Sequence, residues 1–330
     1  MINSKEEKRT ENIQSGACDI SGYVQHGYAD LGPLLDATES ATLRDWINVR
    51  RPVRKEIFYQ TEQEFKVKGR WTNYAPGRTS HNLLLDPSLN LGFIEKNSRF
   101  KEMMGRLCGA NYEVFKKSII RSVPVWAVPQ WILDYVLDVG RPNLNPFIHD
   151  QYQDVQYFLY TDFHQDKTRP ESDFVTVYVY LDEVDAEYSA LKILTGSHKL
   201  GMTVYPHSLR RSLTNPDAWF YSDSLGNHLE CLAHTATGAA GSVTAFHCMT
   251  LHGTGFNQSV NPRISLRYLI KINPTSGNED CLHAKANQQV IGPMKMLQTR
   301  LDVTTSGYQR TGSSLHSHDD WQKVLSNSKR

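Results

Sequence analysis

The stretch VQYFLYTDFHQDKTRPESDFVTVYVYL, residues 155–181, contains the pattern that decides the fold class. Two runs rich in Val, Tyr and Phe, Val155–Thr161 and Phe174–Leu181, flank a polar segment. Runs of β-branched and aromatic residues bounded by polar clusters are typical of strands. In the second run, valines alternate with Tyr178 and Tyr180. This alternation predicts one strand face that packs under helices and one that lines the inside of a barrel.

The flanking sequence predicts helices first and further strands after them. Four more runs have the strand pattern: Tyr112–Ile120, Leu191–Leu194, Ser242–Cys248 and Ile264–Ile272. Two earlier segments have a helical pattern: a capping-box pair, Asp36 and Glu39, before Leu43, Trp46 and Ile47, and the apolar stripe Phe100, Met103, Met104 and Leu107 before Gly109. Helices followed by many strands predict a mainly β fold, an antiparallel sandwich or barrel with flanking helices on one outer face.

The chain is long enough for one sizeable domain with tails. Of its 330 residues 39% are hydrophobic, which supports a single domain over residues 21–290. Residues 1–20 are expected to form a flexible N-terminal tail, and residues 291–330 a polar C-terminal tail. Long stretches at 123–150 and 201–241 interrupt the strands, and such insertions on a β scaffold are typically functional lids.

Composition excludes several classes of protein. With 36 Lys and Arg against 35 Asp and Glu, the chain lacks the basic excess of a dedicated nucleic-acid binder. No run approaches the roughly 18 apolar residues of a membrane span, and the polar start has no signal-peptide core. The five cysteines form no C-x-x-C pair, which argues against a disulfide framework and a thiolate zinc site. A cytoplasmic protein with a small-molecule substrate is therefore expected, as a monomer or weak homodimer.

Candidate metal ligands lie at strand ends. His164 and Asp166 are two residues apart, a spacing that places both side chains on one face of a strand. His252 lies at the end of one predicted strand and Arg263 at the start of the next. Two histidines and one carboxylate on one face of a metal are typical of non-haem Fe(II) oxygenases. A buried Arg is a natural partner for the far carboxylate of a 2-oxo acid, because its fork binds carboxylate bidentately.

In combination, these motifs resemble the phytanoyl-CoA dioxygenase family. The resemblance covers residues 20–272 and rests on the order of His164-Gln165-Asp166, Leu191-Lys192-Ile193, Gly196-Ser197-His198-Lys199, His252-Gly253-Thr254 and Arg263. It implies a double-stranded β-helix core (jelly roll, cupin-like) and dependence on Fe(II), 2-oxoglutarate and O2.

The resemblance also implies roles for particular residues. His164, Asp166 and His252 would be the iron ligands, and Arg263 would bind the distal carboxylate of 2-oxoglutarate. The residues assigned to the co-substrate besides Arg263 are Thr254, Tyr178 and Gln156, the last chosen because period-2 counting puts it on the face of His164. His198 and His247 are interpreted as structural histidines.

The expected reaction is oxidation of an unactivated C–H bond of a small, anionic, natural-product-like substrate, usually hydroxylation, with release of succinate and CO2. Oxidative ring closure or desaturation of an amino-acid-derived carboxylate, as in kainoid synthases, is the alternative. Two other classes remain open: a cupin-type metalloenzyme without 2-oxoglutarate, and a non-catalytic β-sandwich binding module. Arg263 argues against the first, and the complete ligand set argues against the second.

Overall fold

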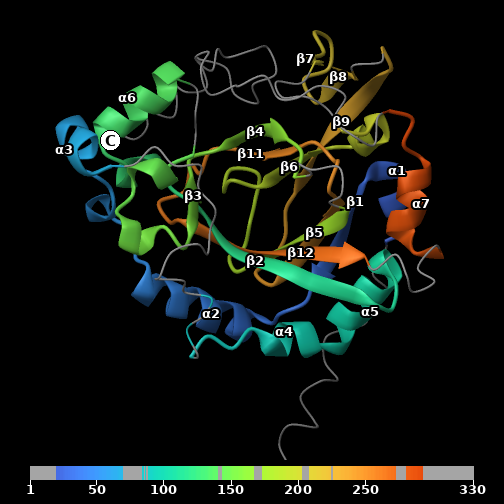
Figure 1. Cartoon of the computed structure of the whole chain (residues 1–330), viewed down its shortest axis with the longest axis horizontal. Helices are drawn as coiled ribbons and strands as arrows, with labels where there is room; N and C mark the ends of the chain where they lie inside the picture. Colours follow the sequence, from blue (N-terminus) through green and yellow to red (C-terminus); the bar gives the residue numbers. More distant parts are fainter. Residues whose placement is uncertain are drawn as a thin grey trace, which may run out of the picture.

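The computed structural model describes residues 20–69, 84, 86, 88–139, 143–166, 173–202, 208–223, 226–272 and 280–292. The predicted tails, residues 1–20 and 291–330, lie almost wholly outside the described residues. The described secondary structure therefore runs from α1 to α7 (Figure 1).

Two six-stranded sheets form the centre of the fold. The first has the order β1 (Tyr28–Pro33), β10 (Ser242–His247), β5 (Phe174–Tyr180), β12 (Arg263–Ile272), β2 (Tyr112–Ser122), β3 (Gln156–Phe158). The second has the order β4 (Thr161–His164), β11 (His252–Thr254), β6 (Leu191–Leu194), β9 (His228–Ala236), β8 (Ala218–Ser222), β7 (Ser208–Arg211). Neighbouring strands are antiparallel except β2 and β3. The chain crosses repeatedly between the sheets, and this confirms the predicted mainly β, double-stranded β-helix fold.

Seven α-helices lie among the described residues: α1 (Tyr23–His26), α2 (Ala37–Arg50), α3 (Glu62–Lys68), α4 (Gly92–Lys96), α5 (Ser98–Cys108), α6 (Gln130–Val139) and α7 (Leu282–Gln288). Both predicted N-terminal helices are confirmed as α2 and α5. The Asp36 carboxylate accepts the N–H of Glu39 at 2.8 Å, and Glu39 accepts the N–H of Asp36 at 3.0 Å, which closes the capping box of α2. Gly109 ends α5 at φ 85°, a value that favours glycine.

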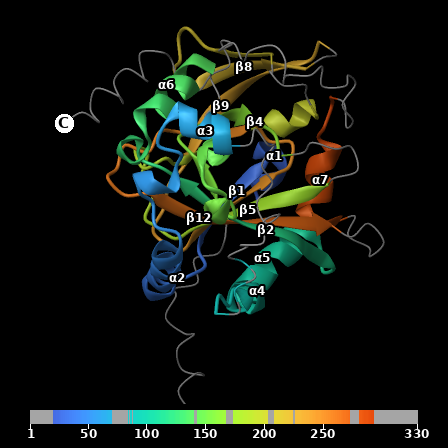
Figure 2. The same ribbon diagram turned by 60° about the vertical axis from the view of Figure 1, so that its left-hand side comes forward.

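The helices and the space between the two sheets lie on opposite faces of the first sheet. Helices α2, α4 and α5 run along its outer face (Figure 2). Val177 and Val179 of β5 belong to one buried cluster with Phe100 of α5, whereas Tyr178 and Tyr180 pack between the sheets. The alternation predicted for this strand is confirmed, because successive side chains of a strand point to opposite faces.

Two parts of the strand prediction are wrong. The run predicted as one strand, Val155–Thr161, divides between the sheets, since β3 ends at Phe158 and β4 begins at Thr161. Strands β1, β7, β8, β9 and β11 were not predicted. His252, expected at the end of a predicted strand, instead begins β11, which lies in the other sheet from β10. Three of the unpredicted strands lie in the stretch 201–241 that was interpreted as an insertion, and β9 pairs with β6 as an integral part of the second sheet. The polar residues of His228–Ala236 interrupt its apolar residues, so the hydrophobic pattern does not identify this segment as a strand.

The other interrupting stretch contains α6. In both views α6 and the β7–β8 hairpin lie on the side of the second sheet, opposite α2, α4 and α5 (Figures 1 and 2). No described helix has the length and apolar character needed to cross a membrane. Within the described residues four cysteines are free thiols: Cys108, Cys231, Cys248 and Cys281.

Candidate active site

Strand pairing brings the two candidate histidines together. His164 ends β4 and His252 begins β11, and the two residues are directly opposite each other in the antiparallel pair. Their ring centroids are 4.3 Å apart. Asp166 follows two residues after His164, and one ligand atom from each of the three side chains lies within 4.8 Å of the others. The structure therefore assembles all three residues that the sequence suggested as metal ligands.

Backbone carbonyls orient both imidazoles. The Nδ1 atom of His164 lies 2.8 Å from the carbonyl oxygen of Asp162, and that of His252 lies 3.0 Å from the carbonyl oxygen of Thr250. Because a carbonyl only accepts, Nδ1 carries the proton and Nε2 keeps its lone pair in both rings. The Nε2 atom of His252 is buried and has no hydrogen-bond partner among the described residues. A buried acceptor of this kind fits a bound metal ion.

The carboxylate of Asp166 is held by two neighbours. Thr176 of β5 donates to Oδ2 at 2.7 Å, and Nη1 of Arg267 on β12 lies 3.5 Å from Oδ1. The same Oδ1 is 3.9 Å from Nε2 of His252. Burial alone would raise the pKa of Asp166, but Arg267, the two histidines and the Thr176 hydrogen bond together lower it well below its usual range. Asp166 is therefore ionised and available as an anionic ligand at neutral pH.

The pKa of His252 moves in the direction that favours metal binding. Burial, and then the neighbouring His164, lower it to about 3. The imidazole is therefore neutral near pH 7, which is the form that binds a metal.

Arg263 presents an incompletely satisfied guanidinium in the interior. Its side chain is only 1% exposed at the start of β12. Nη1 donates to the hydroxyl of Ser265, and the guanidinium carbon lies 5.3 Å from the ring centroid of Tyr180. Nε and Nη2 have no hydrogen-bond partner among the described residues. A buried cation with free donors fits an anionic ligand such as the carboxylate of 2-oxoglutarate.

Two other residues assigned to the co-substrate lie in the same interior. The hydroxyls of Thr254 and Thr161 are 3.2 Å apart, across the β4–β11 pair that also carries the histidines. Tyr178 is directly opposite Arg267 in the β5–β12 pair. Both side chains therefore lie on strands that carry candidate ligands or their partners.

Gln156 does not share a strand with His164, contrary to the prediction, although its position is suitable. Period-2 counting from His164 fails because Gln156 belongs to β3 in the first sheet and His164 to β4 in the second. Gln156 is opposite Ile120 in the β2–β3 pair, and it precedes Phe158 by two residues. Ile120 and Phe158 both pack between the sheets, so Gln156 occupies a register position on the inner face.

The sequence analysis did not assign roles to Thr176 and Ser265. Each has a signal in the sequence, because Thr176 is on the inward face of β5 with Tyr178, and Ser265 follows Arg263 by two residues on the same strand face. Arg267 lies four residues after Arg263 on the same strand, and its position in the sequence fits either the active site or a pair with a structural carboxylate. Its partner is the candidate ligand Asp166.

A double-stranded β-helix with two histidines and a carboxylate converging from adjacent strands is the arrangement of non-haem Fe(II) oxygenases. A family profile described as phytanoyl-CoA dioxygenase (PhyH) matches residues 23–265. The chain therefore belongs to the phytanoyl-CoA dioxygenase family. Members of that family use Fe(II), 2-oxoglutarate and O2, which confirms the predicted enzyme class and cofactors at the level of the family.

Individual relatives are more distant. A probable alpha-ketoglutarate-dependent hypophosphite dioxygenase from Stutzerimonas stutzeri is 35% identical over 115 residues, which are 33% of this chain and 37% of that protein. The chain thus aligns with little more than a third of that relative's length. SnoN, a non-haem alpha-ketoglutarate-dependent epimerase from nogalamycin biosynthesis, has 16% identity and a TM-score of 0.45 over 76% of this chain and 81% of its own. EvdO2 from Micromonospora carbonacea var. aurantiaca has 18% identity and a TM-score of 0.46 over 76% and 89%.

Proposed function

We propose that this protein is an Fe(II)- and 2-oxoglutarate-dependent oxygenase that hydroxylates a small anionic organic substrate and releases succinate and CO2. The observation that carries the proposal is that two sets of side chains lie in the same interior, one suited to a metal ion and the other to a carboxylate. Asp166, His164 and the buried Nε2 of His252, which has no partner among the described residues, suit a divalent metal, and the unpaired Nε and Nη2 of Arg263 suit a carboxylate.

Some of these side chains would bind the metal, and others orient its ligands. His164 and His252 would bind Fe(II) through Nε2, and Asp166 through a carboxylate oxygen. Thr176 and Arg267 hold the carboxylate of Asp166 in place. When bound, iron and 2-oxoglutarate supply the O2-dependent oxidation chemistry, and the protein supplies position and a dry surrounding.

Arg263 and its neighbours would bind the co-substrate in the interior. Arg263 would bind the distal carboxylate of 2-oxoglutarate with the help of Thr254. Burial raises the pKa of Tyr178 to about 12, even though Arg267 acts to lower it. The phenol therefore keeps its proton at neutral pH and can donate a hydrogen bond. Gln156 remains a further candidate for a polar contact from β3.

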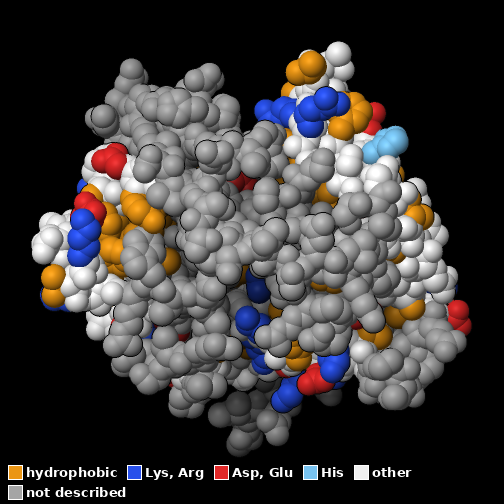
Figure 3. All heavy atoms as spheres, turned by 45° about the horizontal axis from the view of Figure 1, so that its top comes forward, with side chains coloured by type: hydrophobic (Ala, Val, Ile, Leu, Met, Phe, Trp, Pro, Cys, Tyr) orange, Lys and Arg blue, Asp and Glu red, His pale blue; other side chains and the backbone are white. Residues whose placement is uncertain are grey.

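Candidate partners for an anionic substrate are the basic residues Lys117 on β2, Arg267 on β12, and Arg210 and Arg211 on β7. Lys117 forms an ion pair with Glu95, and Arg267 with Asp166, so neither is the first choice for a substrate. The remaining candidates, Arg210 and Arg211, lie on β7. Their guanidinium carbons are 5.5 Å and 5.0 Å from the ring centroids of Phe220 and Trp219 on β8. Basic and apolar side chains gather on this tip of the molecule (Figure 3).

The similarity to the hypophosphite dioxygenase supports a second candidate substrate, a small inorganic oxoanion. The 35% identity is confined to 115 residues, so it favours a related anion and does not name it. Hypophosphite would gain one oxygen atom in the same way as a hydroxylated C–H bond does.

The first step in testing this function measures 2-oxoglutarate binding and requires no substrate. Calorimetry of 2-oxoglutarate added to the Fe(II)-loaded protein under anaerobic conditions should show one site, and no binding would favour a cupin-type enzyme without 2-oxoglutarate. Succinate release is then screened with amino-acid-derived carboxylates, terpenoid acids, acyl-CoA compounds and hypophosphite. Product masses decide the outcome, because one added oxygen supports hydroxylation and a loss of two hydrogens supports ring closure or desaturation. If no compound raises succinate release above the background, the proposed catalytic role is wrong.

A further inference from the structure

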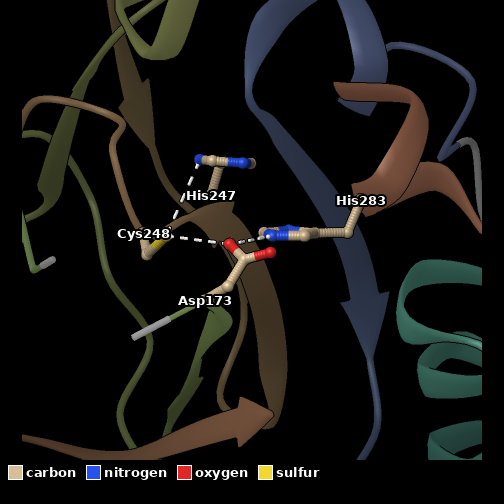
Figure 4. Close-up of side chains that lie close together, drawn as sticks. All are labelled: Asp173, His247, Cys248 and His283. Carbon is tan, nitrogen blue, oxygen red and sulfur yellow. Dashed lines mark hydrogen bonds and ion pairs between the residues drawn. The ribbon is translucent and has the colours of Figure 1, made fainter. Parts of the chain in front are cut away.

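A second group of metal-ligating side chains lies outside the candidate iron site. Asp173 immediately precedes β5, His247 ends β10, Cys248 follows it, and His283 is on α7. These four side chains converge from three segments that are far apart in the sequence (Figure 4). His247, Cys248 and His283 are fully buried, whereas the side chain of Asp173 is 40% exposed. Solvent, and therefore an ion, has access from the side of Asp173.

The spacing of the ligand atoms suits a small ion. Sγ of Cys248 is 3.7 Å from Oδ1 of Asp173 and 3.9 Å from Nδ1 of His247. Nε2 of His283 is 2.8 Å from the same Oδ1, and all four atoms lie within 4.8 Å of one another. Tetrahedral zinc with bonds of about 2.0–2.3 Å places its ligand atoms about 3.3–3.7 Å apart. Small shifts of the side chains would therefore close a coordination shell.

The types of ligand favour zinc over iron. One thiolate, two imidazoles and one carboxylate form a mixed sulfur, nitrogen and oxygen set that zinc binds readily. The iron site, in contrast, offers no sulfur.

Outer hydrogen bonds already orient the ligands. The amide of Asn287 on α7 donates to Oδ2 of Asp173 at 2.9 Å, and the hydroxyl of Tyr23 lies 3.0 Å from Nδ1 of His283. Because the carboxylate of Asp173 only accepts, Nε2 of His283 carries the proton and Nδ1 accepts from the Tyr23 hydroxyl. Metal binding would move this proton to Nδ1, which would then donate to Tyr23. Partners of this kind fix ring orientation in metal sites.

One ligand must turn for the shell to close. The rings of His247 and His283 are stacked, with centroids 4.2 Å apart and planes at 8°. A metal lies near the plane of each imidazole that binds it, so two parallel stacked rings cannot bind one ion together. Nδ1 of His247 also accepts the N–H of Met249 at 3.1 Å. Its Nε2 lies 3.0 Å from Oδ1 of Asn287. His247 would therefore give up both hydrogen bonds when it turns to bind the metal, after Asp173, Cys248 and His283 have bound it.

We propose that Asp173, His247, Cys248 and His283 form a zinc-binding site that is separate from the iron site and fastens α7 to the first sheet. The absence of a C-x-x-C pair had argued against a thiolate zinc site, but a set assembled from three distant segments leaves no spacing motif. Binding converts the Cys248 thiol to a thiolate and releases its proton to the buffer, so affinity rises with pH.

Cobalt(II) titration of the metal-free full-length protein tests the proposal, because only the sulfur-containing site gives a thiolate-to-cobalt charge-transfer band in the near ultraviolet. We expect one equivalent of Co(II) to produce the band and Zn(II) to displace it. Cys248→Ser should abolish the band. The control Cys231→Ser, which changes another buried thiol in β9, and the iron-site variant His164→Ala should both retain it.

Two results would overturn the proposal: no charge-transfer band in the wild-type protein, or a band that survives Cys248→Ser. The first requires no variant, so misfolding of a variant cannot leave the question open. His247→Gln should weaken Co(II) binding at least tenfold, and an unchanged affinity would overturn the four-ligand set. Circular dichroism of each variant establishes that it is folded.

Discussion

Arg263→Met should separate co-substrate binding from stability. The substitution gives an unbranched apolar side chain of similar volume, although shorter, and removes the charge of a guanidinium that is 1% exposed. Losing one partner of a buried, hydrogen-bonded charge pair costs about 2–5 kcal/mol. At about 1.4 kcal/mol per factor of ten, the Kd for 2-oxoglutarate should rise roughly 30- to 4,000-fold. Affinity for Fe(II) should change little, because Arg263 belongs to a different part of the interior.

The same structure predicts that the substitution does not destabilise the ligand-free protein. Nε and Nη2 of Arg263 have no partner there among the described residues, so the wild type carries a buried and poorly satisfied cation. Replacing such a group with an apolar side chain of similar volume is often neutral or stabilising. We therefore expect the free energy of unfolding in urea to be equal to or above that of the wild type.

The assay is anaerobic calorimetry of 2-oxoglutarate with the Fe(II)-loaded protein. Arg210→Met is the matched control, because it removes an exposed arginine from β7 and should leave the Kd unchanged. A normal Kd in Arg263→Met would show that another cation, with Arg267 as the first candidate, binds the carboxylate. A weaker Kd accompanied by a large loss of stability would refute the reasoning about the unsatisfied guanidinium.

Three further predictions concern the metal ligands and pH. Asp166→Ala should abolish turnover and strongly reduce bound Fe(II) in an iron assay, since the two histidines supply no anionic ligand; retained turnover would contradict the ligand assignment. Thr176→Val should weaken Fe(II) binding about 10- to 100-fold in a competition titration, because the hydroxyl donates to Asp166, whereas Thr176→Ser keeps the donor and should bind normally. Burial lowers the folded-state pKa of both His198 and His252 to about 3, so unfolding takes up protons as the pH falls from about 6.5 towards 3. The free energy of unfolding of the metal-free protein should therefore fall by about 3 kcal/mol between pH 7.5 and 5.5, and urea denaturation that shows no such fall would contradict the buried neutral histidines.

The sequence predicted those parts of the fold that depend on local pattern. The capping box at Asp36 and the apolar stripe of α5 are local signals, and both helices formed as expected. Strand β5 could be predicted because its two faces are lined by different kinds of side chain. Strand β9 was missed because its polar and apolar residues do not alternate along its whole length, and its pairing with β6 is a long-range contact.

The candidate site was predictable where its ligands are held in short motifs and unpredictable where it depends on register. His164, Asp166, His252 and Arg263 could be chosen from spacing and order. The contact from Thr176 to Asp166 depends on how β5 lies beside the end of β4, which no spacing reveals. Gln156 shows the opposite error, because regular counting continued across a point where the chain changes sheets.

The location of His164 has a consequence for how iron would leave the protein. Among the described strands, β4 lies at the edge of the second sheet, and its pairing with β11 sets His164 opposite His252. Edge strands fray more easily than central ones, because they have a hydrogen-bonded neighbour on one side only. Each opening of β4 would separate the two imidazoles without unfolding the rest of the barrel. The rate at which a chelator removes the metal would then report how often this four-residue strand opens. Substrates or substitutions that stabilise the pairing of β4 with β11 would slow metal loss in proportion.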